Sequence, residues 1–112
     1  MTLDEFLDNP LLRNEWIAEK NIRVYIRRSV RYINEKMTPA LDVGSVEVDE
    51  GKRGQKVFTE FLRSFEAAAK CAGRIVYVES ILEPRLVPFL ARMGYKFVPD
   101  TAPIAPSMYK IV

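Results

Sequence analysis

The stretch VGSVEVDEGKRGQKVF, residues 43–58, contains a change of hydrophobic period. Up to this change, over residues 41–48, apolar side chains alternate with polar ones, which predicts a β-strand. A polar loop follows at residues 49–55. Beyond the loop, apolar residues recur at helical spacing with charged residues between them, which predicts an amphipathic helix over residues 57–72. The stretch therefore forms the start of an α/β unit.

A second strand and a second helix complete this unit. Residues 75–78 read IVYV, a short apolar run typical of a buried central strand. Residues 83–95 read EPRLVPFLARMGY, where apolar spacing predicts a helix that ends at Gly94. Because strand–helix–strand crossovers are right-handed and join parallel strands, we expect the strands at 41–48 and 74–81 to pair in parallel. The fold class is therefore α/β, a mixed central sheet with helices packed on it.

The flanking segments predict further strands and two short helices. Thr2 and Glu5 have the spacing of a capping box, and apolar residues within 12–17 indicate a second short helix. From residue 22 the period is two, which predicts a strand that continues to residue 33 across a bulge after Arg27 and Arg28. A turn at 34–39 and final strands at 95–98 and 107–112 complete the expected order.

Composition limits the class of protein. The chain has 112 residues, 48% of them hydrophobic and 29% charged, which predicts one globular domain over residues 1–112. The net charge of +2 is too small to indicate a nucleic-acid binder, and no apolar run is long enough to cross a bilayer. Acidic residues near the N-terminus and a single cysteine favour the cytoplasm.

Composition also limits the chemistry and the core. The chain has no histidine, which excludes Ser–His and Cys–His catalysis and argues against a metal site. We expect Cys71, which lies among alanines, to be a small buried thiol. Eight apolar residues of the predicted helices and central strand should form the core: Phe58, Phe61, Leu62, Phe65, Val76, Val78, Phe89 and Leu90.

Residues 43–95 resemble the acyl-CoA-binding half of the GCN5-related N-acetyltransferase (GNAT) fold. The quoted stretch, IVYVESI at 75–81 and EPRLVPFLARMGY at 83–95 match its succession of strand, pyrophosphate loop, long helix, strand, short helix and Gly-aromatic pair. The chain also resembles the abbreviated GNAT-type proteins that some bacteriophages encode. The resemblance implies an N-acetyltransferase domain that uses acetyl-CoA as acyl donor and acylates an amine of a small molecule or protein.

The resemblance also implies which residues would hold the cofactor. In the family, the strand before the loop bonds the pantetheine arm through its backbone, and the loop amides hold the pyrophosphate. A helix N-terminus attracts phosphate for a physical reason, because its N–H groups are unpaired and its dipole is positive there. The alternative is an ordinary polar loop that caps a helix. The positions that correspond are Val46 and Val48 for the arm, and Arg53, Gly54, Gln55 and Lys56 for the pyrophosphate.

Acyl transfer to an ammonium group requires a base. Glu47 and Glu79, on strands beside the expected cofactor groove, are the candidates, and the alternative for each is a solvated strand carboxylate or an ion pair with a neighbouring arginine. The family's acid, a tyrosine four residues before the closing glycine, is replaced by Leu90, which cannot donate a proton. Tyr77 or Tyr109 could take its place.

Two other functions stay open. Leu90, and Lys56 at a position where the family has a small residue, favour a catalytically impaired scaffold that binds and modulates another protein. If the chain is a phage protein, this partner would be a host protein. Alternating arginine and tyrosine residues in 23–32 could bind nucleic acid, but the modest net charge favours an ordinary polar strand face. The oligomeric state is open, with a dimer among the alternatives.

Overall fold

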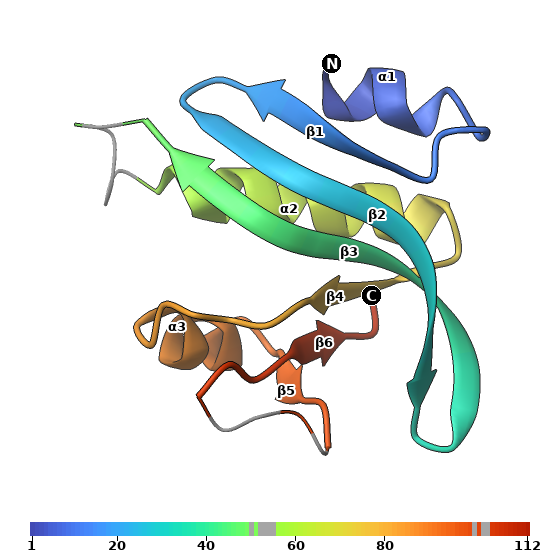
Figure 1. Ribbon diagram of the computed structural model, residues 1–112, viewed down its shortest axis with the longest axis vertical. Helices are drawn as coiled ribbons and strands as arrows, with labels where there is room; N and C mark the ends of the chain where they lie inside the picture. The colour runs from blue at the N-terminus through green and yellow to red at the C-terminus, as the bar shows by residue number, and fades with distance from the viewer. Residues whose placement is uncertain (50, 52–55, 100, 102–103) are drawn as a thin grey trace.

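The structure is a computed structural model that describes residues 1–49, 51, 56–99, 101 and 104–112. Over these residues six strands form one mixed sheet in the order β1-β2-β3-β4-β6-β5, accompanied by three helices (Figure 1). No helix of the described part is long and apolar enough to cross a membrane. The elements in chain order are α1 (Leu3–Leu7), β1 (Asn14–Glu19), β2 (Ile22–Ile33), β3 (Lys36–Val48), α2 (Val57–Cys71), β4 (Ile75–Val78), α3 (Leu86–Arg92), β5 (Lys96–Phe97) and β6 (Met108–Lys110).

The parallel crossover predicted from the change of period is confirmed. Strands β3 and β4 pair in parallel, from Ala40↔Ile75 to Val43↔Val78, and α2 connects them. The other neighbouring strands of the sheet are antiparallel. The chain therefore has the expected fold class, a mixed central sheet with helices packed on it.

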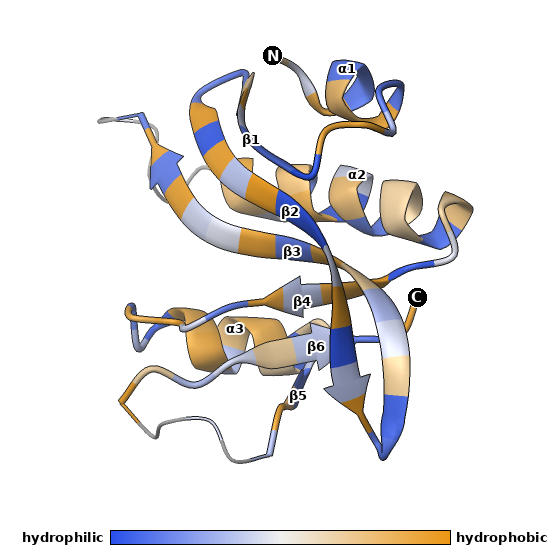
Figure 2. Ribbon diagram, turned by 45° about the vertical axis from the view of Figure 1, so that its right-hand side comes forward, coloured by the Kyte–Doolittle hydropathy of each residue, from blue (hydrophilic) through white to orange (hydrophobic). Residues whose placement is uncertain are grey.

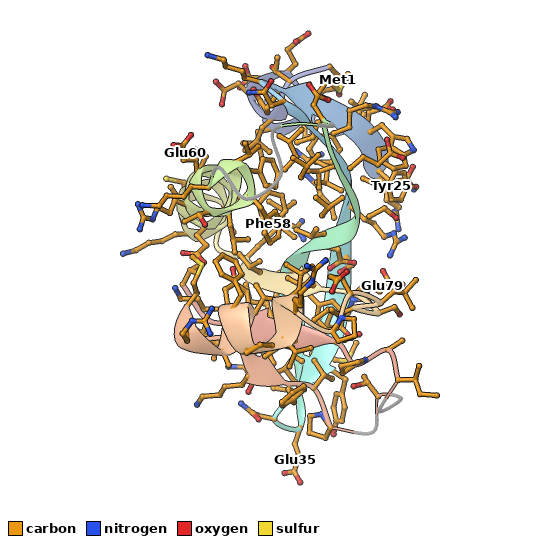
Figure 3. All side chains as sticks on the ribbon, turned by 90° about the vertical axis from the view of Figure 1, so that its left-hand side faces the viewer. Met1, Tyr25, Glu35, Phe58, Glu60 and Glu79 are labelled. Carbon is orange, nitrogen blue, oxygen red and sulfur yellow. The ribbon has the colours of Figure 1, made fainter. Side chains whose placement is uncertain are left out.

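All three helices contribute to one core, on one face of the sheet. Strand β2 alternates apolar and polar residues, visible as orange and blue bands in Figure 2, and its apolar side chains face α1 and α2. Figure 3 shows α2 and α3 on one side of the sheet and Tyr25 and Glu79 on the other. The opposite face, termed the open face, carries a smaller apolar cluster of Ile33, Ala40, Ile75, Tyr77 and Tyr109.

The N-terminal segment contains one helix instead of the two expected. Helix α1 has the predicted capping box between Thr2 and Glu5. The helix expected within residues 12–17 is wrong, because residues from Asn14 onwards form β1. Ile17 is buried in the core, whereas Trp16 points to the other face, where its ring lies 5.5 Å from that of Tyr25. A helix this short has little stability of its own, so pairing with β2 decides the structure.

The hairpin between β2 and β3 is tighter than the turn expected at residues 34–39. Only Asn34 and Glu35, with φ of 51° and 63°, lie in the turn, and Ile33 pairs with Lys36. Positive φ at both central residues is typical of a type I′ hairpin, which favours asparagine at the first of them. Residues as far as Pro39 therefore belong to β3.

The β-bulge lies in β3, opposite the step from Tyr25 to Ile26 of β2. It was expected in β2 itself, after Arg27 and Arg28. Tyr25 pairs with Ser45 but Ile26 pairs with Val43, so Gly44 is the extra residue. A Cβ atom at Gly44 would lie 3.1 Å from a ring carbon of Tyr25. A side chain at this position would therefore require the Tyr25 ring to shift, so the bulge favours glycine here.

The core differs from the expected one at three positions. Six of the eight predicted residues are buried, but Phe58 and Phe89 are only partly buried. Both lie beyond the point where β4 ends, so no strand of the described chain covers them. Cys71 is exposed, not buried, because it lies two residues after the buried Ala69 and so faces the opposite side of α2.

Replacing Phe61 with alanine should lower the free energy of unfolding by about 3–5 kcal/mol, since the substitution empties an aromatic core site. Phe61 is buried and stacks on Phe65 with ring centroids 5.5 Å apart. Urea denaturation measures the effect, and Phe58→Ala, on the same helix but partly exposed, is the matched control. An equal loss in the two variants would contradict the assigned core.

Candidate functional site

Strands β3 and β4 separate at the centre of the sheet. Their last pair is Val43↔Val78, and the backbone N–H of Glu79 donates one further hydrogen bond of 3.0 Å to the carbonyl of Val43. Strand β3 continues to Val48 beside β2, while the chain after Ser80 turns away toward α3. The separation leaves one edge of β3 without a neighbouring strand in the described chain.

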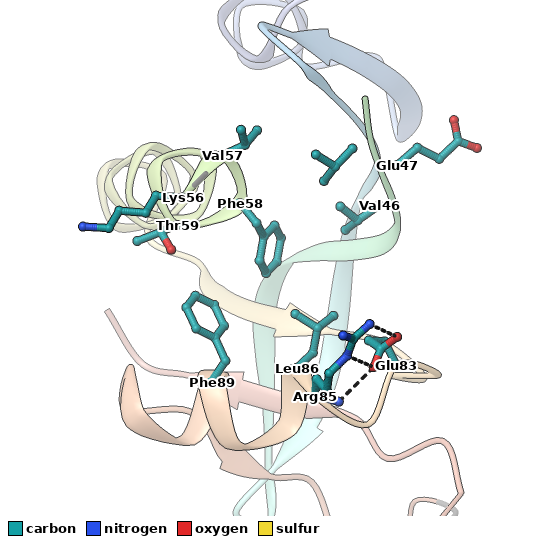
Figure 4. A pocket seen from close by; sticks show the side chains of 11 residues that line it. Val46, Glu47, Lys56, Val57, Phe58, Thr59, Glu83, Arg85, Leu86 and Phe89 are labelled. Atoms are coloured by element: carbon teal, nitrogen blue, oxygen red, sulfur yellow. Dashed lines mark hydrogen bonds and ion pairs between the residues drawn. The ribbon is translucent and has the colours of Figure 1, made fainter. Parts of the chain in front are cut away.

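A groove of about 710 Å³ occupies the space beside this edge. Figure 4 shows Phe58 of α2 and Phe89 of α3 facing each other across the groove, and their ring centroids are 6.0 Å apart. Val46 of β3 and Leu86 of α3 line the same space. The two phenylalanines expected in the core are therefore the walls of a groove, termed here the α2–α3 groove.

The backbone of β3 is oriented toward the groove at alternate residues. The N–H of Asp49 donates to the carbonyl of Asn21 at 2.9 Å, so Asp49 and, two residues earlier, Glu47 direct their backbone groups toward β2. The N–H and C=O groups of Val46 and Val48 therefore point to the other side, along the groove. Such groups can pair with amides of an extended ligand, as an added strand would.

The N-terminus of α2 borders the groove. Lys56 is its N-cap with φ of 62°, and no side chain caps the helix. Lys56 also lines the groove, but its ammonium group points to the outer side of α2 in Figure 4. The other residues expected to hold a pyrophosphate, Arg53, Gly54 and Gln55, lie outside the described residues.

Glu47 lies on the open face. Its carboxylate is 2.8 Å from Nη1 of Arg23 on β2, its side chain is 59% exposed, and it points away from the groove in Figure 4. This ion pair is the alternative that the sequence left open for Glu47. The Val46 side chain of this strand is directed into the space between the helices, and the Glu47 carboxylate is not.

Glu79 lies at the point where the strands separate. It lines a second cavity of about 250 Å³ that shares Val46 and Leu86 with the groove, so the two spaces adjoin. Its carboxylate accepts hydrogen bonds from Arg27 at 2.6 Å and Arg31 at 3.3 Å and is 32% exposed. The hydrogen bond donated to Glu79 raises the pKa of Arg27 above its usual value. The structure thus places Glu79 in the cavity that adjoins the groove, whereas Glu47 belongs to the groove lining but directs its carboxylate away from it.

A buried carboxylate that the sequence analysis did not select holds this region together. The side chain of Asp42 is fully buried in β3 and accepts hydrogen bonds from Ser29 at 2.7 Å and Arg31 at 2.6 Å. The guanidinium carbon of Arg31 lies 4.1 Å from the centre of the Tyr77 ring. A charged residue within the apolar run of a central strand was the feature that could have revealed Asp42.

No tyrosine or cysteine lines the two adjoining cavities, as far as the described residues go. Leu90 is buried in the core, and Tyr77 and Tyr109 are buried neighbours on the open face. Tyr95 donates a hydrogen bond of 2.7 Å to Glu66, and burial, with a smaller effect of this bond, raises its pKa. The described part of the site therefore contains no evident proton donor for a leaving thiolate.

Comparison with known proteins shows the fold. No protein-family profile and no curated protein matches the sequence. The anti-CRISPR protein AcrVA5 is similar with a TM-score of 0.62 at 13% identity, over 88% of this chain and 100% of that chain. A chain of the KacTA–DNA complex is similar with a TM-score of 0.57. A mutant of the toxin AtaT, bound to the C-terminus of the antitoxin AtaR and acetyl-CoA, is similar with a TM-score of 0.55.

The two latter similarities have 16% identity and cover 80% of this chain. This chain spans only 57% of the length of those two proteins. These structural neighbours have the GNAT fold, so the resemblance read from residues 43–95 is confirmed at the level of the fold.

Asp42→Asn should lower the free energy of unfolding by about 3–5 kcal/mol, because it removes the anionic partner of a partly buried arginine. The matched control is Glu47→Gln, which breaks an exposed ion pair and should cost less than about 1 kcal/mol. Both values come from urea denaturation at neutral pH. If Asp42→Asn were as mild as the control, the buried pair would not stabilise the junction of β2, β3 and β4.

Proposed function

We propose that this chain binds an acyl-CoA in the α2–α3 groove and transfers the acyl group to an amine of a small molecule or protein. The observation that carries the proposal is the free edge of β3 beside a groove with apolar walls, next to the N-terminus of α2. A structural neighbour bound to acetyl-CoA supports acetyl-CoA as the donor. We place this activity in the cytoplasm, where acyl-CoA is available, and the phage-like form implied by the sequence stays a prediction.

The residues present fit the parts of such a cofactor. The backbone groups of Val46 and Val48 can pair with the amides of the pantetheine arm, and Phe58 and Phe89 can contact its aliphatic segments. The first turn of α2 offers N–H groups for the pyrophosphate, with additional groups expected from the loop before Lys56. When bound, the cofactor supplies an acyl group activated as a thioester.

Glu79 is the residue that we assign as the base. It lies where the groove meets the gap between β3 and β4, so an amine that enters this gap would be next to its carboxylate. Arg27 and Arg31 both donate hydrogen bonds to that carboxylate. The substrate ammonium group must displace at least one of these two arginines before Glu79 can accept its proton. The thiolate that leaves takes a proton from solvent, since the described lining offers no tyrosine.

The second candidate function is a scaffold that binds a protein and performs no transfer. It is favoured by the ion pairs of both candidate bases and by the burial of Leu90. A nucleic-acid function for the open face is disfavoured, because Glu47, Glu79 and Asp42 neutralise the arginines of β2 that lie there.

Acetyl-CoA should bind with a 1:1 stoichiometry in isothermal titration calorimetry, and raised salt should weaken the binding. Val46→Pro removes one N–H that faces the groove and should weaken affinity by about tenfold, the effect of one hydrogen bond of about 1.4 kcal/mol. Val46→Thr has a side chain of the same shape, retains the N–H and is the control. No heat and no thermal shift with millimolar acetyl-CoA would favour the scaffold.

Glu79→Gln should leave acetyl-CoA affinity nearly unchanged and lower kcat by about 100-fold or more, the usual contribution of a general base. Glu47→Gln, on the open face, is the matched control with kcat close to that of the native protein. Equal activity of the two variants would exclude Glu79 as the base.

A further inference from the structure

Another cavity, of about 280 Å³, lies at the opposite end of α2 from the groove. It is lined by Arg13, which precedes β1, by Arg28 of β2 and by Arg74, which precedes β4. In Figure 1 the α1–β1 connection and the C-terminal end of α2 lie together on the right, whereas the N-terminal end of α2 lies on the left. This space is termed the arginine cavity.

The charges of the arginine cavity are not neutralised within the described residues. Arg28 donates hydrogen bonds only to backbone carbonyls in and after α1, among them that of Phe6 at 3.2 Å. One terminal nitrogen of Arg74 donates to the carbonyls of Ser29 and Ala40, each at 3.1 Å. Neither guanidinium forms an ion pair in the described chain, unlike the arginines of the open face. Burial, and then the charge of Arg74, lower the pKa of Arg28.

A free strand edge adjoins the arginine cavity. Strand β1 pairs with β2 only as far as Arg27, and the last hydrogen bond on this side runs from the N–H of Arg28 to the carbonyl of Arg13 at 2.7 Å. Strand β2 continues to Ile33. By the alternation of an antiparallel ladder, the backbone groups of Val30 and Tyr32 point to the same side as those of Arg28, where no described strand lies.

Apolar side chains follow this edge. Val30 lines the cavity and is 57% exposed, and Leu11, on the other side of the cavity, is 92% exposed. Tyr32 and its cross-strand partner Met37 are exposed on the same face of the β2–β3 hairpin as Val30. A strand edge, an apolar strip and three arginines that have no carboxylate partner among the described residues therefore adjoin one another.

We propose that this edge binds an extended acidic peptide segment, which adds a strand beside residues 29–33 of β2. Backbone pairing with Val30 and Tyr32 holds the segment, its apolar side chains cover Val30 and Tyr32, and its carboxylates enter the arginine cavity. Planar carboxylates match the fork of the Arg74 guanidinium, in which only one terminal nitrogen donates hydrogen bonds to described residues. This function is independent of acyl transfer and of the α2–α3 groove.

Charge and shape favour such a peptide over two other occupants. A second copy of the chain paired at the same edge would bring three more arginines toward those of the cavity, and like charges oppose this contact. A nucleic-acid strand would leave the aliphatic Leu11 and Val30 without apolar partners, because phosphates and sugars do not cover them well.

The test uses fluorescence anisotropy with a fluorescein-labelled peptide, LTLTETE, and its reverse, ETETLTL, which cover both strand directions. One of them should bind saturably, and the same peptide with glutamine in place of glutamate should bind at least about tenfold more weakly. Arg13→Glu should weaken binding by at least about tenfold, while Arg63→Glu, exposed on α2, should change it by less than about twofold. Val30→Pro should also weaken binding by about tenfold, and Val30→Thr, which retains the N–H, should not.

Several results would overturn the proposal. These are the absence of saturable binding by both peptides, equal binding of the glutamine peptide, or equal effects of Arg13→Glu and Arg63→Glu. Tighter binding of a single-stranded oligonucleotide that is lost in Arg13→Glu would assign the cavity to nucleic acid. A dimer in sedimentation that Val30→Pro dissociates would assign the edge to a second copy. Far-UV circular dichroism and urea denaturation of each variant verify that the fold is intact, whether or not the groove binds acetyl-CoA.

Discussion

The short parallel ladder between β3 and β4 is the constraint on which the other features depend. It joins four residues of each strand, from Ala40↔Ile75 to Val43↔Val78, and then ends while β3 continues. The bulge at Gly44 begins at this point and changes which residues of β3 face the helices. Because β4 is short, the start of α2 and the face of α3 do not meet a strand, and their phenylalanines line a groove instead of a core.

Charged side chains on the open face stabilise the point where β3 and β4 separate. Asp42 is buried directly before the separation, and Arg31 links it to Glu79 directly after the separation. A buried carboxylate is tolerated only when it is paired and hydrogen-bonded, so these arginines stabilise the junction. The assigned base is consequently part of a structural network, and an acceptor amine must compete with Arg27 for Glu79. The proposed catalysis would thus depend on the same hydrogen bonds that stabilise the junction.

The sequence predicted what depends on local period and missed what depends on tertiary position. The change of period across residues 43–58 was sufficient to predict the parallel crossover. The capping-box spacing of Thr2 and Glu5 was sufficient to predict α1. Residues 12–17 could not be assigned, because their strand exists only through pairing with β2. Helical spacing places Phe58 and Phe89 on inward faces but does not show where the covering strand ends. The predicted contacts of Val46 and Val48 with a cofactor have a suitable backbone direction and stay a prediction.

Both proposed binding regions have the same structural basis, a strand that extends beyond the end of its neighbour and leaves an unpaired edge in the described chain. Strand β3 extends beyond β4 at one end of the sheet, and β2 extends beyond β1 at the other. Edges of this kind attract further strands unless charges or loops protect them. At the groove, the N-terminus of α2 fits the proposed ligand with an extended, amide-containing arm and a negative end. At β2, the arginine cavity fits the proposed acidic peptide. The two regions lie at opposite ends of α2, so a ligand in one does not obstruct the other.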